Sequence, residues 1–205
     1  MNYRTITMQE AHERFDLYWI DTPDPGADRW YTDAAEIRLF EGDVHIPGDF
    51  KQEYLGSNAD GVNIIVGGNL IVEGHCERDS DGTNFMLVAG SVKAHAVSVA
   101  GGAYVTVKGN LEADLLYGLN GEESRLWVAG DVHAGVIYSD YFMMAFDKSV
   151  QGLVFGTKEY VKAKNIAIAF ADEEASLHPG ILDNHGDLDL EKALLFLEQG
   201  KDITK

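Results

Sequence analysis

The chain contains little cysteine and little proline. Its single cysteine, Cys76, excludes a disulfide framework and a cysteine-rich zinc site, and we expect a small buried side chain rather than a reactive thiol. The 4 prolines stand against 22 glycines among 205 residues, which excludes a proline-rich, low-complexity chain and indicates many tight glycine turns. With 45% hydrophobic residues, a chain of this length can fill one substantial core.

Basic residues are also scarce. The 16 lysines and arginines against 34 aspartates and glutamates give a formal charge of −18. Such a surface repels phosphate backbones, so we expect no nucleic-acid partner. It would attract a basic protein, although acidity of this kind can also serve solubility alone.

Long hydrophobic runs are absent. No stretch of about 18 apolar residues occurs, and the N-terminal sequence MNYRTITMQEAHERF holds no apolar run of signal-peptide length. We therefore expect no membrane partner and a cytoplasmic location.

What the sequence does contain is a repeat over residues 62–137. Four segments align: NIIVGGNLIVEG, FMLVAGSVKAHA, YVTVKGNLEADL and RLWVAGDVHAGV. Each holds a marker glycine, and successive marker glycines are 22, 19 and 21 residues apart. This period fits one coil of a β-solenoid and is too short for a propeller blade. The marker glycines are Gly68, Gly90, Gly109 and Gly130.

The residues around each marker glycine alternate with the period of a β-strand. The positions four and two residues before it, and two and four after it, are apolar in all four segments. One coil cannot bury both ends of its apolar stack, so successive coils should lie on each other with their strands parallel. The sequence predicts an all-β fold, a single-stranded parallel β-helix (β-solenoid), which we expect to be right-handed. The apolar positions are Ile64, Val66, Leu70, Val72, Met86, Val88, Val92, Ala94, Val105, Val107, Leu111, Ala113, Leu126, Val128, Val132 and Ala134.

The marker glycines predict corners. Each falls on the inward phase of the alternation, where a side chain would point into a tight bend. The alternative is a bulge that interrupts a single strand. We expect two strand segments and a variable loop in each repeat, joined at a turn of short polar residues. The residues that follow the marker glycines are Asn69, Ser91, Asn110 and Asp131.

The chain should form one structural domain of three parts. Residues 1–36 are a nonrepeating lead segment, in which Thr7 and Glu10 have the spacing of a capping box before a short helix. Residues 37–174 form the solenoid, with polar loops expected at 77–84 and 118–125. Its first coil surrounds Gly42 and is imperfect, because Arg38 takes an apolar position.

Residues 175–205 should hold an amphipathic C-terminal capping helix. Asp187 or Asp189 can cap it, and Leu190, Ala193 and Leu194 begin its apolar stripe. The open last coil is the nearest apolar surface, so we expect the helix to cover that end of the solenoid.

The segments GGNLIVEG, AGSVKAHA, KGNLEADL and AGDVHAGV resemble the coils of bactofilins, the polymer-forming cytoskeletal β-helix proteins of bacteria. The resemblance covers about the middle half of the chain. It implies nucleotide-free filaments, formed by stacking the ends of the β-helices. The lead segment and the C-terminal helix depart from that pattern, because terminal caps oppose end-to-end growth.

No set of residues predicts a reaction centre. The histidines do not share one position relative to the marker glycines, so we expect no metal site. Asp43 and Asp131 each follow a glycine, and we interpret them as turn residues rather than as a catalytic carboxylate pair. No phosphate-binding glycine motif or nucleophile elbow occurs between a strand and a helix. We therefore expect no catalytic residue and no cofactor.

The tyrosines of the repeat offer a further candidate. Tyr117 and Tyr138 both stand eight residues after a marker glycine, and together with Tyr141 they would form an interaction face if they were exposed. We expect a non-enzymatic scaffold that binds a basic protein, for instance as an immunity or inhibitor protein, or that associates with itself. Two alternatives stay open: a bactofilin-like self-assembling structural protein, and a carbohydrate-active β-helix enzyme with an acidic groove.

Overall fold

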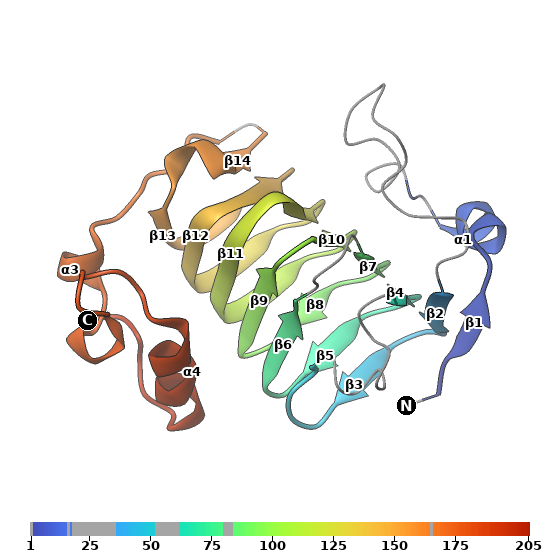
Figure 1. Ribbon diagram of the computed structural model, residues 1–205, viewed down its shortest axis with the longest axis horizontal. Helices are drawn as coiled ribbons and strands as arrows, with labels where there is room; N and C mark the ends of the chain where they lie inside the picture. Colours follow the sequence, from blue (N-terminus) through green and yellow to red (C-terminus); the bar gives the residue numbers. More distant parts are fainter. Residues whose placement is uncertain (1, 16, 18–35, 52–61, 80–83, 165) are drawn as a thin grey trace.

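The computed structural model describes residues 2–15, 17, 36–51, 62–79, 84–164 and 166–205. Its strands form one 14-stranded sheet that winds into a solenoid (Figure 1). The strands pair in parallel between successive coils, and only β1 (Arg4–Ile6) is antiparallel, against β2 (Glu36–Phe40), among the described strands. The predicted all-β solenoid is confirmed.

Each coil contributes to three columns of strands, named here the first, second and third sheets. The first sheet stacks β2, β4 (Val62–Val66), β7 (Asn84–Val88), β10 (Ala103–Val107), the ends of β11 (Leu111–Val128) and β12 (Val132–Phe146), and β14 (Val161–Ala163). The second stacks β3 (Val44–Ile46), β5 (Leu70–Val72), β8 (Val92–Lys93) and the starts of β11, β12 and β13 (Val150–Gly156). The third stacks β6 (His75–Arg78), β9 (Ala96–Ala100), the middles of β11 and β12, and the rest of β13.

The third sheet corrects the prediction of two strand segments and a variable loop in each repeat. Leu115 and Val136 point outward from this sheet and are nevertheless buried, so its strands lack the alternation of apolar and polar residues. The loop predicted at 118–125 is shorter than expected, because β11 continues through Gly121, which pairs with Phe142, and pairs again from Arg125, which is opposite Met143. The register shift leaves residues 122–124 without counterparts on β12. Of the loop predicted at 77–84, residues 80–83 lie outside the described residues.

The core of the solenoid lies between the three sheets. All sixteen apolar positions picked out by the repeat belong to it. The third sheet adds an inward row that includes Cys76, Leu116 and Ile137. Cys76 is buried as expected, and burial raises the pKa of its thiol to about 12, which keeps the thiol protonated and unreactive.

The four marker glycines lie at the corner between the first and second sheets. None of them has a positive φ, so backbone conformation does not require glycine there. A Cβ on Gly90 would instead lie 2.7 Å from the carbonyl oxygen of Gly68 in the preceding coil. The missing side chains would thus point along the stack, not into the corner as predicted, and the close approach of successive coils explains the glycines.

A ladder of short polar side chains follows the marker glycines along this corner. In each coil the side chain of the residue after the glycine accepts a hydrogen bond from the backbone N–H of its equivalent in the next coil. The bonds are Asn69 N to Asp43 Oδ1 (2.7 Å), Ser91 N to Asn69 Oδ1 (2.9 Å), Asn110 N to Ser91 Oγ (3.0 Å), Asp131 N to Asn110 Oδ1 (2.9 Å) and Ser149 N to Asp131 Oδ1 (3.2 Å).

The N-terminal segment covers the outside of the first sheet. Thr7 caps α1 (Met8–Arg14) by accepting the N–H of Glu10 at 3.1 Å, while the Glu10 carboxylate binds Arg4 and Arg14 instead of closing a capping box. Apolar side chains of β1 and α1 pack on the outward residues of β2, β4, β7 and β10. Most of the predicted lead segment, residues 18–35, lies outside the described residues.

Arg38 occupies an inward position of the first coil, as its sequence register predicted. It is 7% exposed, its Nε lies 2.8 Å from Glu36 Oε1, and its guanidinium stacks on the ring of Tyr3 at 4.7 Å. Among the described residues no parallel coil stacks before β2, so a long side chain with a charged tip is accommodated at this end of the core.

The C-terminal segment covers the outside of the third sheet rather than the last coil, which corrects the predicted position of the capping helix. It contains α3 (Glu173–Ser176) and α4 (Leu190–Glu198), the latter capped by Asp189, which accepts the N–H of Lys192 at 3.1 Å. Leu177, Ile181 and Ala193 pack on outward residues of β9, β11, β12 and β13. The described residues also contain 3₁₀ turns at Lys158–Tyr160, before this segment, and at Pro179–Ile181, within it.

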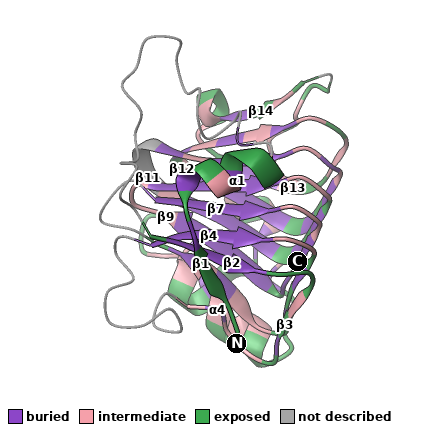
Figure 2. Cartoon of the chain, turned by 90° about the vertical axis from the view of Figure 1, so that its right-hand side faces the viewer, coloured by how far each residue is buried: buried purple, intermediate pink, exposed green. Residues whose placement is uncertain are grey.

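The N-terminal and C-terminal segments therefore cover the outward sides of the first and third sheets, respectively. Viewed from the N-terminal end in Figure 2, the strands are largely buried, and exposed residues are prominent on α1 and α4. The outward side of the second sheet differs, because its residues are largely exposed.

Candidate functional site

The outward side of the second sheet is exposed along the solenoid. In β5, β8 and the starts of β11 and β12, buried and exposed residues alternate, as in the run from Leu111 to Asp114. We name the exposed positions the open face. They are His45, Ile71, Lys93, Glu112, His133 and Gln151 in one row, and Glu73, His95 and Asp114 in the next.

Ion pairs join neighbouring coils across the open face. Lys93 Nζ lies 2.5 Å from Glu112 Oε1. Two imidazoles also meet carboxylates: His45 Nε2 lies 2.9 Å from Glu73 Oε1, and His95 Nδ1 lies 2.8 Å from Asp114 Oδ2. All of these side chains are more than half exposed, so each pair contributes little stability, about 1 kcal/mol or less.

The open face carries more negative than positive charge. Its carboxylates are Glu73, Glu112 and Asp114, against the single ammonium of Lys93. Asp131 in the adjoining corner adds a further carboxylate, whose pKa is lowered by hydrogen bonds from the Ser149 hydroxyl and backbone N–H. The second sheet thus presents more carboxylates than ammonium groups.

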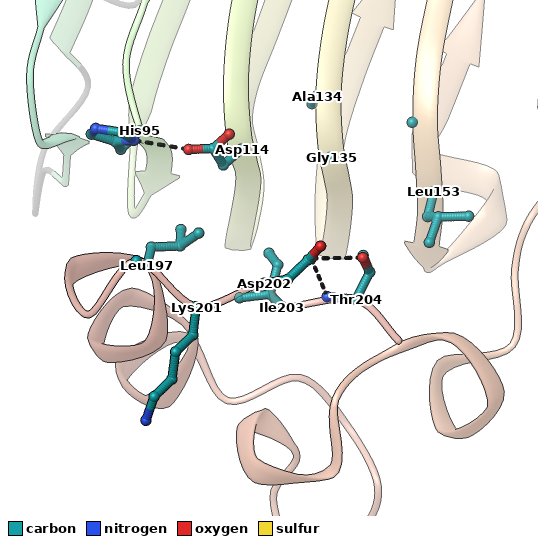
Figure 3. Close-up of a pocket in the computed structure, with 12 residues that line it drawn as sticks. His95, Asp114, Ala134, Gly135, Leu153, Leu197, Lys201, Asp202, Ile203 and Thr204 are labelled. Carbon is teal, nitrogen blue, oxygen red and sulfur yellow. Dashed lines mark hydrogen bonds and ion pairs between the residues drawn. The ribbon is translucent and has the colours of Figure 1, made fainter.

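A groove runs between the edge of the open face and α4 (Figure 3). One part, of about 740 Å³, is lined by His95 and Asp114 on the coil side and by Leu197, Asp202 and Thr204 on the C-terminal side. Lys201 also lines this part, and its side chain points away from the coils in Figure 3. A second part, of about 250 Å³, lies further toward the N-terminal coils.

His75 lines this second part and bonds to Ser98, with 2.6 Å between Nε2 and Oγ. Burial lowers the pKa of His75 to about 4, so the imidazole is neutral at pH 7 and is a weak base. Ser98 is 7% exposed and is not among the described residues that line the groove. The pair therefore lacks the access that a nucleophile needs.

Arg78 is a buried charge inside the solenoid. Its Nη2 donates to the carbonyl of Val62 at 2.7 Å, and its Nε and Nη1 have no hydrogen-bond partner among the described residues. Burial lowers the pKa of Arg78 to about 10, so the guanidinium stays charged at neutral pH. The cavity beside it is only about 10 Å³, too small for a ligand.

The predicted tyrosine face is not exposed as a unit. Tyr117 and Tyr138 are each 6% exposed and stack with ring centroids 5.3 Å apart beneath the C-terminal segment, so this chain itself covers them. Tyr141 is 61% exposed, has a positive φ of 51°, and meets the Tyr160 ring edge-on at 6.0 Å. Only Tyr141 keeps the exposure that an interaction face requires.

Sequence reasoning placed some of the open-face residues in a common register without identifying the face. His45 and His133 both lie three residues after a glycine. Both belong to the row of the open face that runs from His45 to Gln151. The exposed positions of the face lie between the apolar positions that define the repeat. Those intervening polar residues were the signal that could have found the face.

The described residues contain no group of three or more histidine, cysteine, aspartate or glutamate side chains arranged to hold a metal ion. Within the same residues, no helix is long and apolar enough to cross a bilayer. No protein-family model, no curated protein and no solved structure matches this chain.

Proposed function

We propose that this protein is a non-enzymatic scaffold that binds a basic protein on its open face. The observation that carries the proposal is the asymmetry of the three sheets. The N-terminal segment covers the first and the C-terminal segment covers the third, whereas the outward residues of the second are exposed. An immunity or inhibitor protein that neutralises a cationic partner is one concrete form of this function.

The charge of the chain supports a basic partner. The net charge of −18 attracts cations over roughly 8 Å at physiological salt, and the three carboxylates of the open face lie in or directly after strands of the second sheet. Because the face is solvent-exposed, this attraction should act mainly on the rate of association and should weaken as salt rises.

Charge reversal tests the proposal. The variant Glu73→Lys, Glu112→Lys, Asp114→Lys changes the open face, and Glu13→Lys, Glu159→Lys, Glu191→Lys is a control with the same change in net charge at exposed positions elsewhere. With a ten-residue oligolysine peptide as the probe, we expect the open-face variant to lose at least about tenfold more affinity than the control. Circular dichroism would verify that both variants are folded.

Equal losses in the two variants would show that the peptide responds only to net charge, and the open face would be rejected as the site. Titrations at about 0.05 and 0.3 M salt provide a second comparison, because binding that is electrostatic must weaken between them. Binding that is unchanged by salt would contradict the role of the carboxylates.

A second candidate is bactofilin-like self-assembly, which the edges of the second sheet favour. Among the described strands, β3 pairs only with β5, and β13 pairs only with β12. Such edges can accept a strand from another molecule. In the first sheet, however, β1 pairs antiparallel with β2 and occupies the edge on which another coil would stack. Sedimentation velocity over a range of concentrations distinguishes filaments from small species.

The carbohydrate-active alternative receives less support from the groove. Asp114 and Asp202 both line its larger part. Hydrogen bonds from the hydroxyl and backbone N–H of Thr204 lower the pKa of Asp202, which suits an ionised carboxylate but not a general acid. Asp202→Asn without loss of any measured glycosidase activity would remove this candidate.

A further inference from the structure

Residues 172–205, named here the lid, have a backbone that bonds mainly to itself. His178 N donates to Ile203 O, Lys205 N to Ser176 O and Asp189 N to Ile181 O, each at 2.9 Å. Ala171 N, just before the lid, donates to Val154 O of β13 at 2.8 Å. In the described chain, the backbone hydrogen bonds of the lid itself close within the lid. The lid is therefore not a continuation of the coils.

The contact between the lid and the third sheet is apolar and aromatic. Leu177, Ile181, Leu188, Ala193 and Ile203 of the lid are buried against outward side chains of the sheet. The stacked rings of Tyr117 and Tyr138 lie in this contact. Apolar burial is not directional, so such an interface can part without breaking a ladder of backbone hydrogen bonds.

Carboxylates gather at this interface. The Tyr138 hydroxyl bonds to Glu173, whose Oε2 is buried without a partner among the described residues. Asp187 and Asp172 of the lid also face Glu173, and Asp187 faces Asp140 of β12.

These surroundings raise the pKa of two carboxyl groups. Burial, followed by the repulsion of Asp187, raises the pKa of both Glu173 and Asp140. The lid's cation nearest in sequence to this cluster, Lys192, pairs with Asp189 at 3.1 Å and with the carbonyl of Leu182 at 2.8 Å. The docked lid thus favours the protonated form of both carboxyl groups.

We propose that residues 172–205 form a detachable lid over the tyrosines of the third sheet, and that the lid docks more firmly at mildly acidic than at neutral pH. Opening exposes an aromatic surface that the coils carry and that the closed structure hides.

The direction of the pH dependence follows from linkage. When the lid opens, Glu173 and Asp140 become solvated and return toward ordinary pKa values of 4.5 and 3.8. The closed form then binds more protons than the open form between those values and the raised ones. Docking is strongest below the ordinary values and weakens as pH rises through the raised pKa values, beyond which the full penalty of two partly buried charges remains.

Thiol labelling can measure the opening. Val136 is 0% exposed beneath the lid, so Val136→Cys places a thiol on the covered sheet with little loss of volume. Cys76, 4% exposed in the solenoid core, reports opening of the coils in the same molecule. A pyridyl disulfide labels thiols at both pH 5 and pH 7. We expect the thiol at position 136 to react about tenfold faster than Cys76, with this ratio rising roughly three- to tenfold from pH 5 to pH 7.

Glu173→Gln provides the decisive variant, because it keeps an acceptor for the Tyr138 hydroxyl and removes the charge. The labelling ratio at pH 7 should fall toward the pH 5 value in this variant, with the remaining pH dependence due to Asp140. The ratio should not change in Glu198→Gln, at an exposed position on α4. Equal labelling of the two thiols would show that the lid opens only when the whole fold does. A ratio that is independent of pH, or of Glu173, would overturn the role of the carboxylates.

Discussion

At the residue scale, the marker glycines are explained by the distance between coils. Gly68 and Gly67 are adjacent, and neither has a positive φ, yet they differ in the space around them. A Cβ on Gly68 would lie 2.6 Å from the carbonyl carbon of Gly42, whereas a Cβ on Gly67 would meet nothing closer than 3.3 Å. Sequence reasoning identified the right glycines for a different reason, because the alternation cannot show how closely the next coil approaches.

This difference makes a testable pair of variants. Gly68→Ala should lower the free energy of unfolding by about 2–4 kcal/mol, because the backbone of the preceding coil must move away from the new methyl group. Gly67→Ala should cost less than about 1 kcal/mol. Urea unfolding measures both, and equal costs would contradict the explanation by close approach.

Asn110 belongs to the ladder of polar side chains that joins successive coils at the corner between the first and second sheets. Its Oδ1 accepts the N–H of Asp131 at 2.9 Å, and its own N–H donates to Ser91 Oγ. Asn110→Ala should lower the free energy of unfolding by about 1 kcal/mol, because the N–H of Asp131 loses its acceptor. Asn110→Ser should recover part of that loss, since serine already performs this role at position 91. Thermal unfolding of both variants tests the order, and a serine variant less stable than the alanine variant would contradict it.

At the element scale, the sequence predicted the strands on either side of each marker glycine and missed those of the third sheet. The strands of the first sheet are buried on both sides and were still found, because their apolar positions recur at fixed distances before each marker glycine. The strands of the second sheet alternate between buried and exposed residues, so their phase could be read directly. In the third sheet, Leu115 and Leu116 are both 0% exposed, because the core buries one and the lid buries the other. A strand covered on both sides has no such alternation, and its cover lies more than 50 residues away in the chain.

The same long-range contact explains the misplaced helix. The apolar stripe of α4 correctly indicated that it must be buried, and Ala193 is fully covered. The amphipathic pattern indicates that one side of the helix is buried against an apolar surface. It does not indicate which surface of the protein that is. Two were available, the last coil and the side of the third sheet, and the choice of the side also hides Tyr117 and Tyr138. The position of the helix and the burial of two of the three candidate tyrosines therefore have one cause.

At the scale of the whole molecule, the flanking segments determine which surfaces can meet another protein. The N-terminal segment covers one end of the stack as well as one side, because β1 pairs with β2 from Arg4 opposite Leu39 to Ile6 opposite Ile37. Tyr3 lies against Phe40 of the first coil, with ring centroids 5.7 Å apart. In this arrangement β1 prevents a coil of another molecule from stacking on β2 in the first sheet. In the second sheet, β3 remains an edge strand among the described strands.

Removing residues 1–6 should therefore promote self-association. The truncation frees the edge of β2 and uncovers Phe40, and an unpaired parallel edge recruits another strand. Sedimentation velocity should show species larger than those of the full chain, increasing with protein concentration. Arg4→Ala, which removes ion pairs with Glu10 and Glu41 but leaves the strand in place, should sediment as the full chain does. A truncated protein that sediments like the full chain at every concentration would show that β1 does not limit assembly. The lid or the net charge of −18 would then be what prevents filament formation.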